Sequence, residues 1–209
     1  MSLGELTKHR NDIIAKLDEK YVVSEEIKMM GDEVDDLWGE ICSRRTPDGI
    51  YGIPSMFPVL NEWFTYEPTE LILIQASYKQ GKSVILMLEA LHRITNGIPT
   101  LYIDREMSDR LFYERVLAAL TGIEVKNGRY NEEEARRIAD ANEWMKKQPF
   151  VHMYRPDITE EELYAICKIL KYKMGLQFVI YDYIKSNESD SSVNYNVLGR
   201  ITDFLKNKI

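Results

Sequence analysis

The segment Ala76-Ser-Tyr-Lys-Gln-Gly-Lys-Ser83 has residue types and a spacing that can hold phosphate groups. It follows the short apolar run 71–74 and opens an apolar helix predicted over 83–93, as a phosphate-binding loop does, although Ala76 stands where the usual pattern has Gly. Backbone N–H groups of such a loop surround phosphates, and the helix N-terminus adds positive potential. The predicted phosphate-binding residues are Ala76, Ser77, Tyr78, Lys79, Gln80, Gly81, Lys82 and Ser83.

Within this loop, two side chains have distinct chemical roles. Lys82 can reach the β- and γ-phosphates of a nucleotide, and the Ser83 hydroxyl can ligate Mg²⁺. We therefore predict a catalytic role for Lys82 and a metal-binding role for Ser83, with ATP and Mg²⁺ as cofactors. A purely structural loop is the alternative interpretation.

Carboxylates follow two other apolar runs. Asp182 ends the run 178–181, and Asp104 and Glu106 follow the run 100–103. Because the carboxyl ends of parallel strands share one edge of a sheet, these acids are expected beside the phosphate loop. There Asp182 can hold a metal-bound water, while Glu106 can orient and deprotonate the attacking water. Asp104 is the competing candidate for that second role, and turn or capping residues are the structural alternative for all of them.

The elements that must position these residues alternate between apolar runs and helical patterns. Strand, loop, helix and strand over 71–103 predict a βαβ unit. The remaining predicted helices span 109–121, 131–147 and 160–173, and the remaining predicted strands span 150–154 and 178–181. Asn131 with Glu134 and Thr159 with Glu162 have the spacing of helix caps. The sequence therefore predicts an α/β fold with a mostly parallel sheet flanked by helices.

The first 45 residues are charged and helical in pattern, and we interpret 1–45 as a helical linker or subunit-docking segment that leads, through a turn-rich break over 43–49, into one domain over 46–209. An apolar stripe with steps of three and four residues consists of Ile27, Met30, Val34, Leu37, Trp38 and Ile41. This stripe predicts an amphipathic helix that packs either on its own domain or on a neighbouring subunit.

Composition limits the class of protein further. The chain has 209 residues, of which 44% are hydrophobic and 29% charged, so intrinsic disorder and collagen are excluded. No apolar run is long enough to span a membrane, and Cys42 and Cys167 form no disulfide framework or metal motif, which favours a soluble cytoplasmic protein. The net charge of −7 argues against binding nucleic acid by bulk charge. His9, His92 and His152 are scattered, and we assign them no chemistry.

Four segments together resemble, in order and spacing, the ATPase domain of DnaB-type replicative helicases over about residues 45–209. They are 52–60, the loop 76–83, Asp104-Arg-Glu-Met-Ser108 with Arg115 beyond it, and 178–183. The segments 127–132 and 157–160 add to the likeness, and the family tolerates Ala at the first loop position. One departure is the pair Ile184-Lys185, where the family commonly has Leu-Gln.

The resemblance implies a RecA-like P-loop ATPase core, of cellular or phage origin, that assembles into a hexamer and moves on single-stranded DNA. It further implies a primase and a helicase loader as partners and the cytoplasm of a bacterial or phage-infected cell as the location. The C-terminal part of the core, with its arginine finger and phosphate-sensing residue, is expected to lie beyond Ile209. We therefore expect this chain alone to hydrolyse ATP slowly if at all.

DNA contact is predicted at Lys185 and Arg200, on a polar segment that could face the lumen of a ring, although a solvated loop is the alternative. Two other functions stay open from the residues. One is a RecA-like recombinase or regulatory ATPase without unwinding activity. The other is a non-catalytic module that binds nucleotide and recruits a partner.

Overall fold

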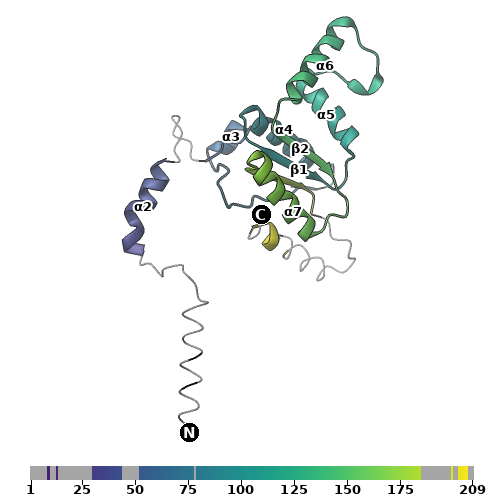
Figure 1. Cartoon of the computed structure of the whole chain (residues 1–209). Coiled ribbons are helices and arrows are strands. Elements are labelled where there is room, and N and C mark those ends of the chain that lie inside the picture. The colour runs from purple at the N-terminus through teal and green to yellow at the C-terminus, as the bar shows by residue number, and fades with distance from the viewer. Residues whose placement is uncertain are drawn as a thin grey trace. The chain divides into compact units, whose positions relative to one another are not determined.

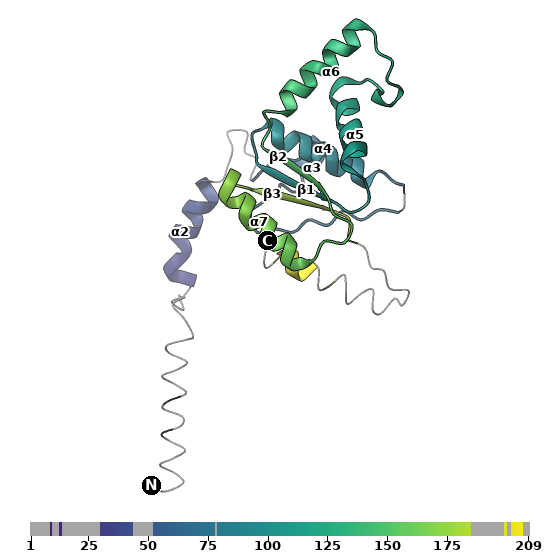
Figure 2. The same cartoon turned by 45° about the vertical axis from the view of Figure 1, so that its right-hand side comes forward.

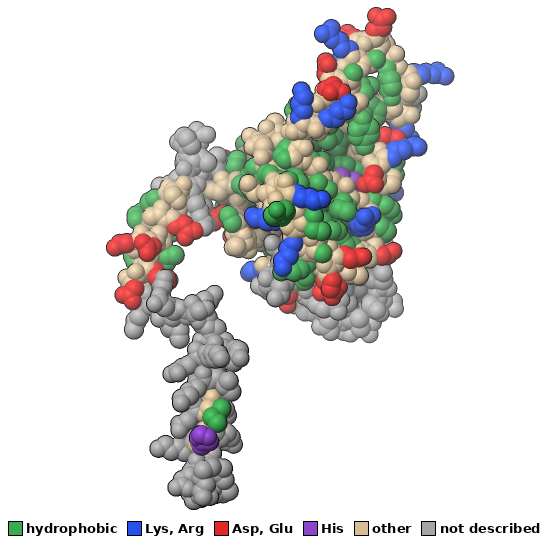
Figure 3. All heavy atoms as spheres, viewed as in Figure 1, with side chains coloured by type: hydrophobic (Ala, Val, Ile, Leu, Met, Phe, Trp, Pro, Cys, Tyr) green, Lys and Arg blue, Asp and Glu red, His purple; other side chains and the backbone are tan. Residues whose placement is uncertain are grey.

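The computed structural model describes residues 9, 13, 30–43, 52–77, 79–184, 199 and 202–206. The chain divides into two units, Met1–Gly49 and Ile50–Ile209, each described here by itself. In the first unit, helix α2 (Met30–Ser43) confirms a helix within the N-terminal segment. The stripe residues on α2 are exposed, and acidic side chains lie along this helix (Figure 3). The partner of this stripe stays a prediction.

A parallel three-stranded sheet organises the second unit (Figure 1). Its strand order is β2 (Phe150–Tyr154), β1 (Thr100–Asp104), β3 (Phe178–Asp182). The three strands begin and end level with one another, because Thr100 is the register partner of both Phe150 and Phe178. The predicted parallel sheet is thus confirmed, and its carboxyl ends form one edge.

Alternate residues of the central strand face two separate hydrophobic clusters. Tyr102 packs with residues of α4 (Lys82–Thr95) and α5 (Asp109–Thr121), whereas Leu101 and Ile103 pack with α7 (Glu160–Met174). Figure 2 shows α7 and α4 on opposite sides of the strands. All five residues of β1 are buried, as expected for a strand covered by helices on both faces.

The helix boundaries follow local sequence signals. Asn131 and Glu134 form a reciprocal capping box at the start of α6 (Glu132–Met145), and Thr159 and Glu162 form another at the start of α7. The 3-10 helix Val125–Asn127 and Gly128, which has a positive φ, connect α5 to α6. α6 has no buried residue and projects away from the sheet (Figure 1). Both predicted caps are confirmed.

The prediction of a strand over 71–74 is wrong. These residues have no strand geometry, and Leu73 and Ile74 are 61% and 36% exposed. An apolar run becomes a strand only where a neighbouring strand supplies the backbone hydrogen bonds, and the described residues form no ladder with this run. The βαβ unit therefore reduces to an irregular segment followed by α4 and β1.

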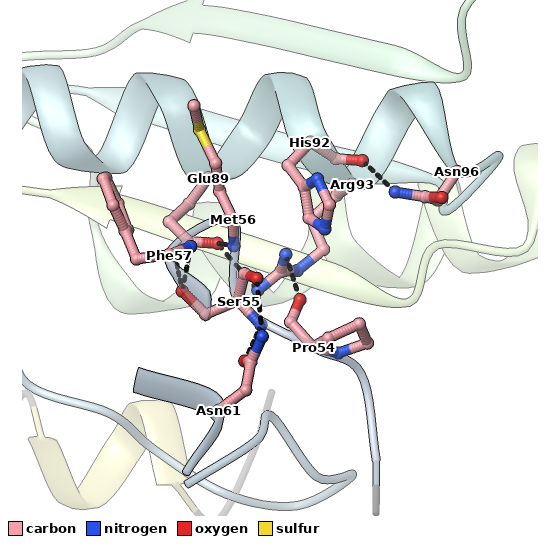
Figure 4. Close-up of polar contacts among 9 residues, drawn as sticks. All are labelled: Pro54, Ser55, Met56, Phe57, Asn61, Glu89, His92, Arg93 and Asn96. Carbon is pink, nitrogen blue, oxygen red and sulfur yellow. Dashed lines mark hydrogen bonds and ion pairs between the residues drawn. The ribbon is translucent and has the colours of Figure 1, made fainter. Parts of the chain in front are cut away.

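A segment ahead of the phosphate loop is fastened onto the C-terminal half of α4 (Figure 4). Ser55 Oγ and the Met56 backbone N–H donate to the carboxylate of Glu89, and Arg93 Nη1 donates to the Pro54 carbonyl at 2.9 Å. Arg93 Nη2 also lies 3.0 Å from Glu89 Oε2 as an ion pair outside hydrogen-bond geometry. We call Ser55, Glu89 and Arg93, all buried, the latch.

Aromatic rings complete the surroundings of the latch. The Arg93 guanidinium lies 4.1 Å from the centre of the Tyr66 ring and 4.7 Å from that of Phe178. Burial lowers the pKa of Arg93, and burial, followed by the charge of Glu89, raises the pKa of Tyr66 to about 12. Within the latch, the buried carboxylate of Glu89 and the buried guanidinium of Arg93 therefore compensate each other's charge.

Among the described residues, none of the helices has the length and apolar character needed to cross a membrane.

Candidate functional site

The carboxyl edge of the sheet brings the predicted acids together. Asp104 and Asp182 are register partners at the ends of β1 and β3. The Arg105 backbone N–H donates to the Asp182 carbonyl at 2.7 Å, which extends the ladder by one residue and ties the segment leading to Glu106 to β3. Glu106 is exposed at this edge. The sequence prediction that these strand ends meet is confirmed.

Asp182 is 3% exposed, and the Tyr102 hydroxyl donates to its Oδ2 at 2.7 Å. Burial, followed by the charge of Asp182, raises the pKa of Tyr102, so this phenol stays protonated and acts as a donor. Within the described part of the chain, the second carboxylate oxygen of Asp182 makes no hydrogen bond. Tyr102 thus orients the Asp182 carboxylate through one of its two oxygens.

Asp104 has a different environment from Glu106. It is 1% exposed, and its Oδ1 accepts the backbone N–H groups of Glu106 at 2.8 Å and Met107 at 2.6 Å. A carboxylate used in this way holds a turn, because it replaces the backbone acceptors that the turn lacks. Asp104 therefore shapes the turn that presents Glu106, and it is Glu106 that faces solvent.

The phosphate loop leads directly into α4. Gly81 is the helix N-cap at φ 87°, a left-handed conformation that favours glycine, and it contributes no side-chain cap. Lys82 Nζ donates to the carbonyls of Ala76 at 2.6 Å and Ser77 at 3.0 Å. The lysine thus folds back over its own loop, while the helix start keeps backbone donors of the kind that bind anions.

The direction of α4 places its start at the carboxyl edge. Arg93, near the end of α4, lies over the ring of Phe178, the first residue of β3, so the helix runs antiparallel to this strand. The eleven-residue step from Lys82 to Arg93 covers about 16 Å of helix, and the four-residue step from Phe178 to Asp182 covers about 13 Å of strand. Lys82 and Ser83 therefore begin α4 at the level of Asp182.

The side-chain oxygens of Ser83 and Asp182 are of the kind that bind a hard cation such as Mg²⁺. Mg²⁺ is usually held by one or two protein oxygens together with substrate phosphates and water. A hydroxyl at Ser83 and a partly unpaired buried carboxylate at Asp182 are donors of this type. The described residues hold no group of three or more His, Cys, Asp or Glu side chains that could bind a metal alone. Any Mg²⁺ here would thus depend on the nucleotide.

Sequence reasoning missed the contacts of His152, the middle residue of β2, with acids near this edge. Its Nδ1 lies 2.8 Å from Asp109 Oδ1, and its Nε2 lies 3.7 Å from Asp104 Oδ2. The two carboxylates are 43 and 48 residues away in sequence, so no local motif announces the contact. The signal available was the alignment of two predicted parallel strands, which makes His152 the register partner of Tyr102.

Three predicted binding residues lie outside the described residues. They are Tyr78 in the phosphate loop and the predicted DNA contacts Lys185 and Arg200.

Comparison with known proteins identifies the family. The model of the DnaB-like helicase C-terminal domain matches residues 52–208. The replicative DNA helicase DnaB of Leifsonia xyli subsp. xyli is 26% identical over 160 residues, covering 74% of this chain and 35% of that protein. DnaB of Treponema pallidum is 27% identical over 187 residues, covering 86% and 43%. The chain thus spans less than half the length of these curated relatives.

Solved structures agree on the fold. A structure described as an ATPase domain superposes with a TM-score of 0.73 at 18% identity, covering 87% of this chain and 66% of that one. A DnaB-like replicative helicase, described with its interactions with primase, gives a TM-score of 0.69 at 19% identity, covering 94% and 49%. The fold is thus that of a RecA-like ATPase domain. With three-quarters of its length matched by the family model, the chain belongs to the DnaB-like helicase C-terminal domain family.

Proposed function

We propose that this chain is the ATPase domain of an ATP-dependent replicative DNA helicase. It couples hydrolysis of Mg²⁺-ATP at subunit interfaces to translocation on single-stranded DNA. The observation that carries the proposal is that Asp182 and the Glu106 turn held by Asp104 lie at one sheet edge, in a chain of this family whose phosphate loop opens α4. A fold alone would not support an activity, whereas this set of side chains matches the requirements of phosphoryl transfer.

The residues have separate tasks in the proposed reaction. Gly81 and the start of α4 receive the phosphates on backbone N–H groups, and Lys82 leaves its loop carbonyls to pair with the β- and γ-phosphates. Ser83 and Asp182 would hold Mg²⁺, which supplies positive charge to the phosphates when bound. Tyr102 keeps Asp182 oriented through its hydroxyl.

Glu106 is the proposed general base. Its exposed carboxylate can accept a proton from a water that attacks the γ-phosphate, and its position is set by the Asp104 turn. Asp104 is unsuited to this role, because its Oδ1 is occupied by two backbone donors and the side chain is buried. The proposal therefore separates the base from the residue that shapes its turn.

Assembly and partners are also part of the proposal. Primase is proposed as a partner from the description of a DnaB-like relative. A homohexamer, single-stranded DNA, a helicase loader and a cytoplasmic location are proposed from membership of the DnaB-like helicase family. DNA contacts at Lys185 and Arg200 are proposed on the positive charge that pairs with phosphates.

The test is ATP-dependent unwinding of forked DNA by the full-length gene product. Lys82→Ala and Glu106→Gln should each lower ATP turnover by at least about 100-fold and abolish unwinding. Lys146→Ala and Glu143→Gln, on the projecting helix α6 and its C-terminal end, are matched controls of the same charge change and should retain both activities. Turnover that survives Glu106→Gln would contradict the assignment of the base.

Two other outcomes would change the function and keep the fold. ATP turnover without unwinding, also in the presence of a loader, would indicate a recombinase or regulatory ATPase. Tight nucleotide binding with no turnover would indicate a non-catalytic module.

A further inference from the structure

The carboxylate of Glu106 has no partner of its own. The side chain is exposed, and among the described residues it forms no hydrogen bond or ion pair. The direction in which this carboxylate points therefore depends on how the backbone around it is held. One hold is the side chain of Asp104, whose Oδ1 accepts the Glu106 backbone N–H at 2.8 Å. The residue between these two acids, Arg105, supplies another.

Arg105 joins three segments of the chain at the carboxyl edge of the sheet. Its backbone N–H donates to the Asp182 carbonyl at 2.7 Å, at the end of β3. Its Nε donates to the Pro156 carbonyl at 2.8 Å, in the connection from β2 to α7. The Arg155 backbone N–H in turn donates to the Asp104 carbonyl at 2.7 Å, so this connection is tied to the end of β1 twice.

The guanidinium of Arg105 lies on the α7 face of the sheet. Its carbon is 6.0 Å from the centre of the Tyr181 ring, which packs with the hydrophobic cluster beneath α7. Burial raises the pKa of Tyr181, so the phenol stays uncharged beside the guanidinium. Asp104 follows Ile103 of that cluster and, because side chains alternate along a strand, lies on the opposite face. The turn is therefore held from both faces of the sheet.

The hydrogen bond from Arg105 to Pro156 affects placement more than stability. It is exposed to solvent, so its net contribution to folding is small. The position of a reacting group is more sensitive, because a displacement of about 1 Å can cost about 100-fold in rate. The Arg105 side chain is therefore expected to matter more for turnover than for the stability of the fold.

We infer that Arg105 is a positioning residue for the proposed hydrolysis: its side chain ties the turn before Glu106 to the connection between β2 and α7 and so fixes where the Glu106 carboxylate points. This inference rests on the proposed function, because it concerns the aim of the proposed base. Arg105 itself touches neither nucleotide nor attacking water, since its guanidinium lies on the α7 face and the phosphate loop opens α4 on the other face (Figure 2).

The first measurement is steady-state ATP turnover of the full-length protein, together with equilibrium binding of a fluorescent ATP analogue. Arg105→Ala removes the hydrogen bond to Pro156 and should lower kcat about 10-fold, while KM and the affinity for nucleotide change less than about twofold. Arg105→Lys keeps a donor on a long side chain and should recover part of the loss. Arg110→Ala, whose exposed side chain pairs with Glu114 on the same helix, is the control and should keep the wild-type kcat.

The second measurement places Arg105→Ala in a Glu106→Gln background. If Arg105 acts by aiming the Glu106 carboxylate, the residual turnover of Glu106→Gln should not fall further, because two residues that act as one unit are non-additive. A residue needed only for folding, or one that acts on the nucleotide, would lower the residual rate again by about the same factor. The slow residual rates are measured in single turnover, with protein in excess over ATP.

The outcomes separate this inference from the proposed function. If Arg105→Ala keeps the wild-type kcat, or lowers kcat equally in both backgrounds, the positioning role is wrong, while loss of turnover in Lys82→Ala and Glu106→Gln still supports the function. If turnover survives Glu106→Gln, the proposed base itself is wrong, and the positioning role is wrong with it.

Thermal unfolding of each variant shows whether it folds. If Arg105→Ala does not fold, Arg105→Met decides the inference, because it keeps a long side chain against Tyr181 but has no donor for Pro156. The same loss of about 10-fold in kcat is expected for Arg105→Met, and a wild-type kcat in this variant would overturn the positioning role.

Discussion

The two ends of α4 handle charge in opposite ways. At its C-terminal half, the latch buries Glu89 and Arg93 and pairs them with each other, with Ser55 and with backbone groups. At its start, Lys82 has only loop carbonyls as partners and lies beside an edge where Asp182 keeps an oxygen unpaired within the described residues. Charges matched inside the fold stabilise it, whereas incompletely matched charges are available to a ligand.

The largest expected change in stability comes from removing one charged residue of the latch. Glu89→Ala should lower the free energy of unfolding by about 3–5 kcal/mol, because Arg93 is fully buried and would lose its counter-charge. Chemical denaturation measures the loss. Glu114→Ala removes the acid of an exposed pair at the same i,i+4 spacing and should cost only about 0.3–0.5 kcal/mol. Equal losses in the two variants would contradict a buried pair.

A second change tests the segment that the latch fastens. Gly52 has φ +75°, and a Cβ there would meet the Tyr66 carbonyl oxygen at 2.8 Å, where Ile53 and Tyr66 form an antiparallel bridge. Gly52→Ala should therefore cost about 1–3 kcal/mol of unfolding free energy, measured by denaturation. Gly97→Ala is the control, since its φ is +74° but nothing lies within 4 Å of the added atom. If Gly52→Ala lowers the free energy of unfolding no more than Gly97→Ala does, the Tyr66 carbonyl can move away from the added Cβ at little cost.

The corresponding change at the carboxyl edge of the sheet is Tyr102→Phe, on β1. It removes the hydroxyl that donates to Asp182 and should lower the free energy of unfolding by about 1–2 kcal/mol, because a buried carboxylate loses its donor. It should also raise the Mg²⁺ concentration needed for ATP turnover, which a metal titration would reveal. Tyr172→Phe, at a side chain on α7 that is 93% exposed, is the control and should leave both quantities near the wild type.

The last expected effect is confined to alkaline pH and concerns Tyr66, whose ring packs on the latch residue Arg93. Because the pKa of Tyr66 is raised from 10.0 to about 12 in the folded state, its contribution is fully present below pH 10 and is lost as pH rises towards 12. Denaturant midpoints over this range should fall more steeply in the wild type than in Tyr66→Phe. Identical slopes would show that Tyr66 ionises as readily in the folded as in the unfolded chain.

Local signals made several parts of the fold predictable. The capping boxes at Asn131 and Thr159 depend on residues three apart, so their helices begin where the sequence indicates. The acids at 104 and 182 were placed correctly at one edge because parallel strands end together. The prediction at 71–74 failed because strand formation depends on a neighbour that no local pattern supplies.

The polar core of the fold was not predictable from the sequence. Glu89 and Arg93 have the i,i+4 spacing of an ordinary surface pair, and only the docking of the segment around Ser55 makes them buried. His152 had no chemistry assigned because its acidic neighbours come from two other elements. The roles of Lys82, Ser83 and Glu106 stay predictions, although the structure describes their positions.

The level register of the three strands constrains where the chain can change in length. Side chains along each strand alternate between the α4 face and the α7 face of the sheet. If one residue were added or lost within β3, the position of Asp182 would be taken by an adjacent residue, and Asp182 would point to the other face. The same change in the connection Val125–Asn127, between α5 and α6, would leave every strand residue on its own side. Insertions compatible with this edge are therefore confined to the connections, and the strands keep a fixed count of residues.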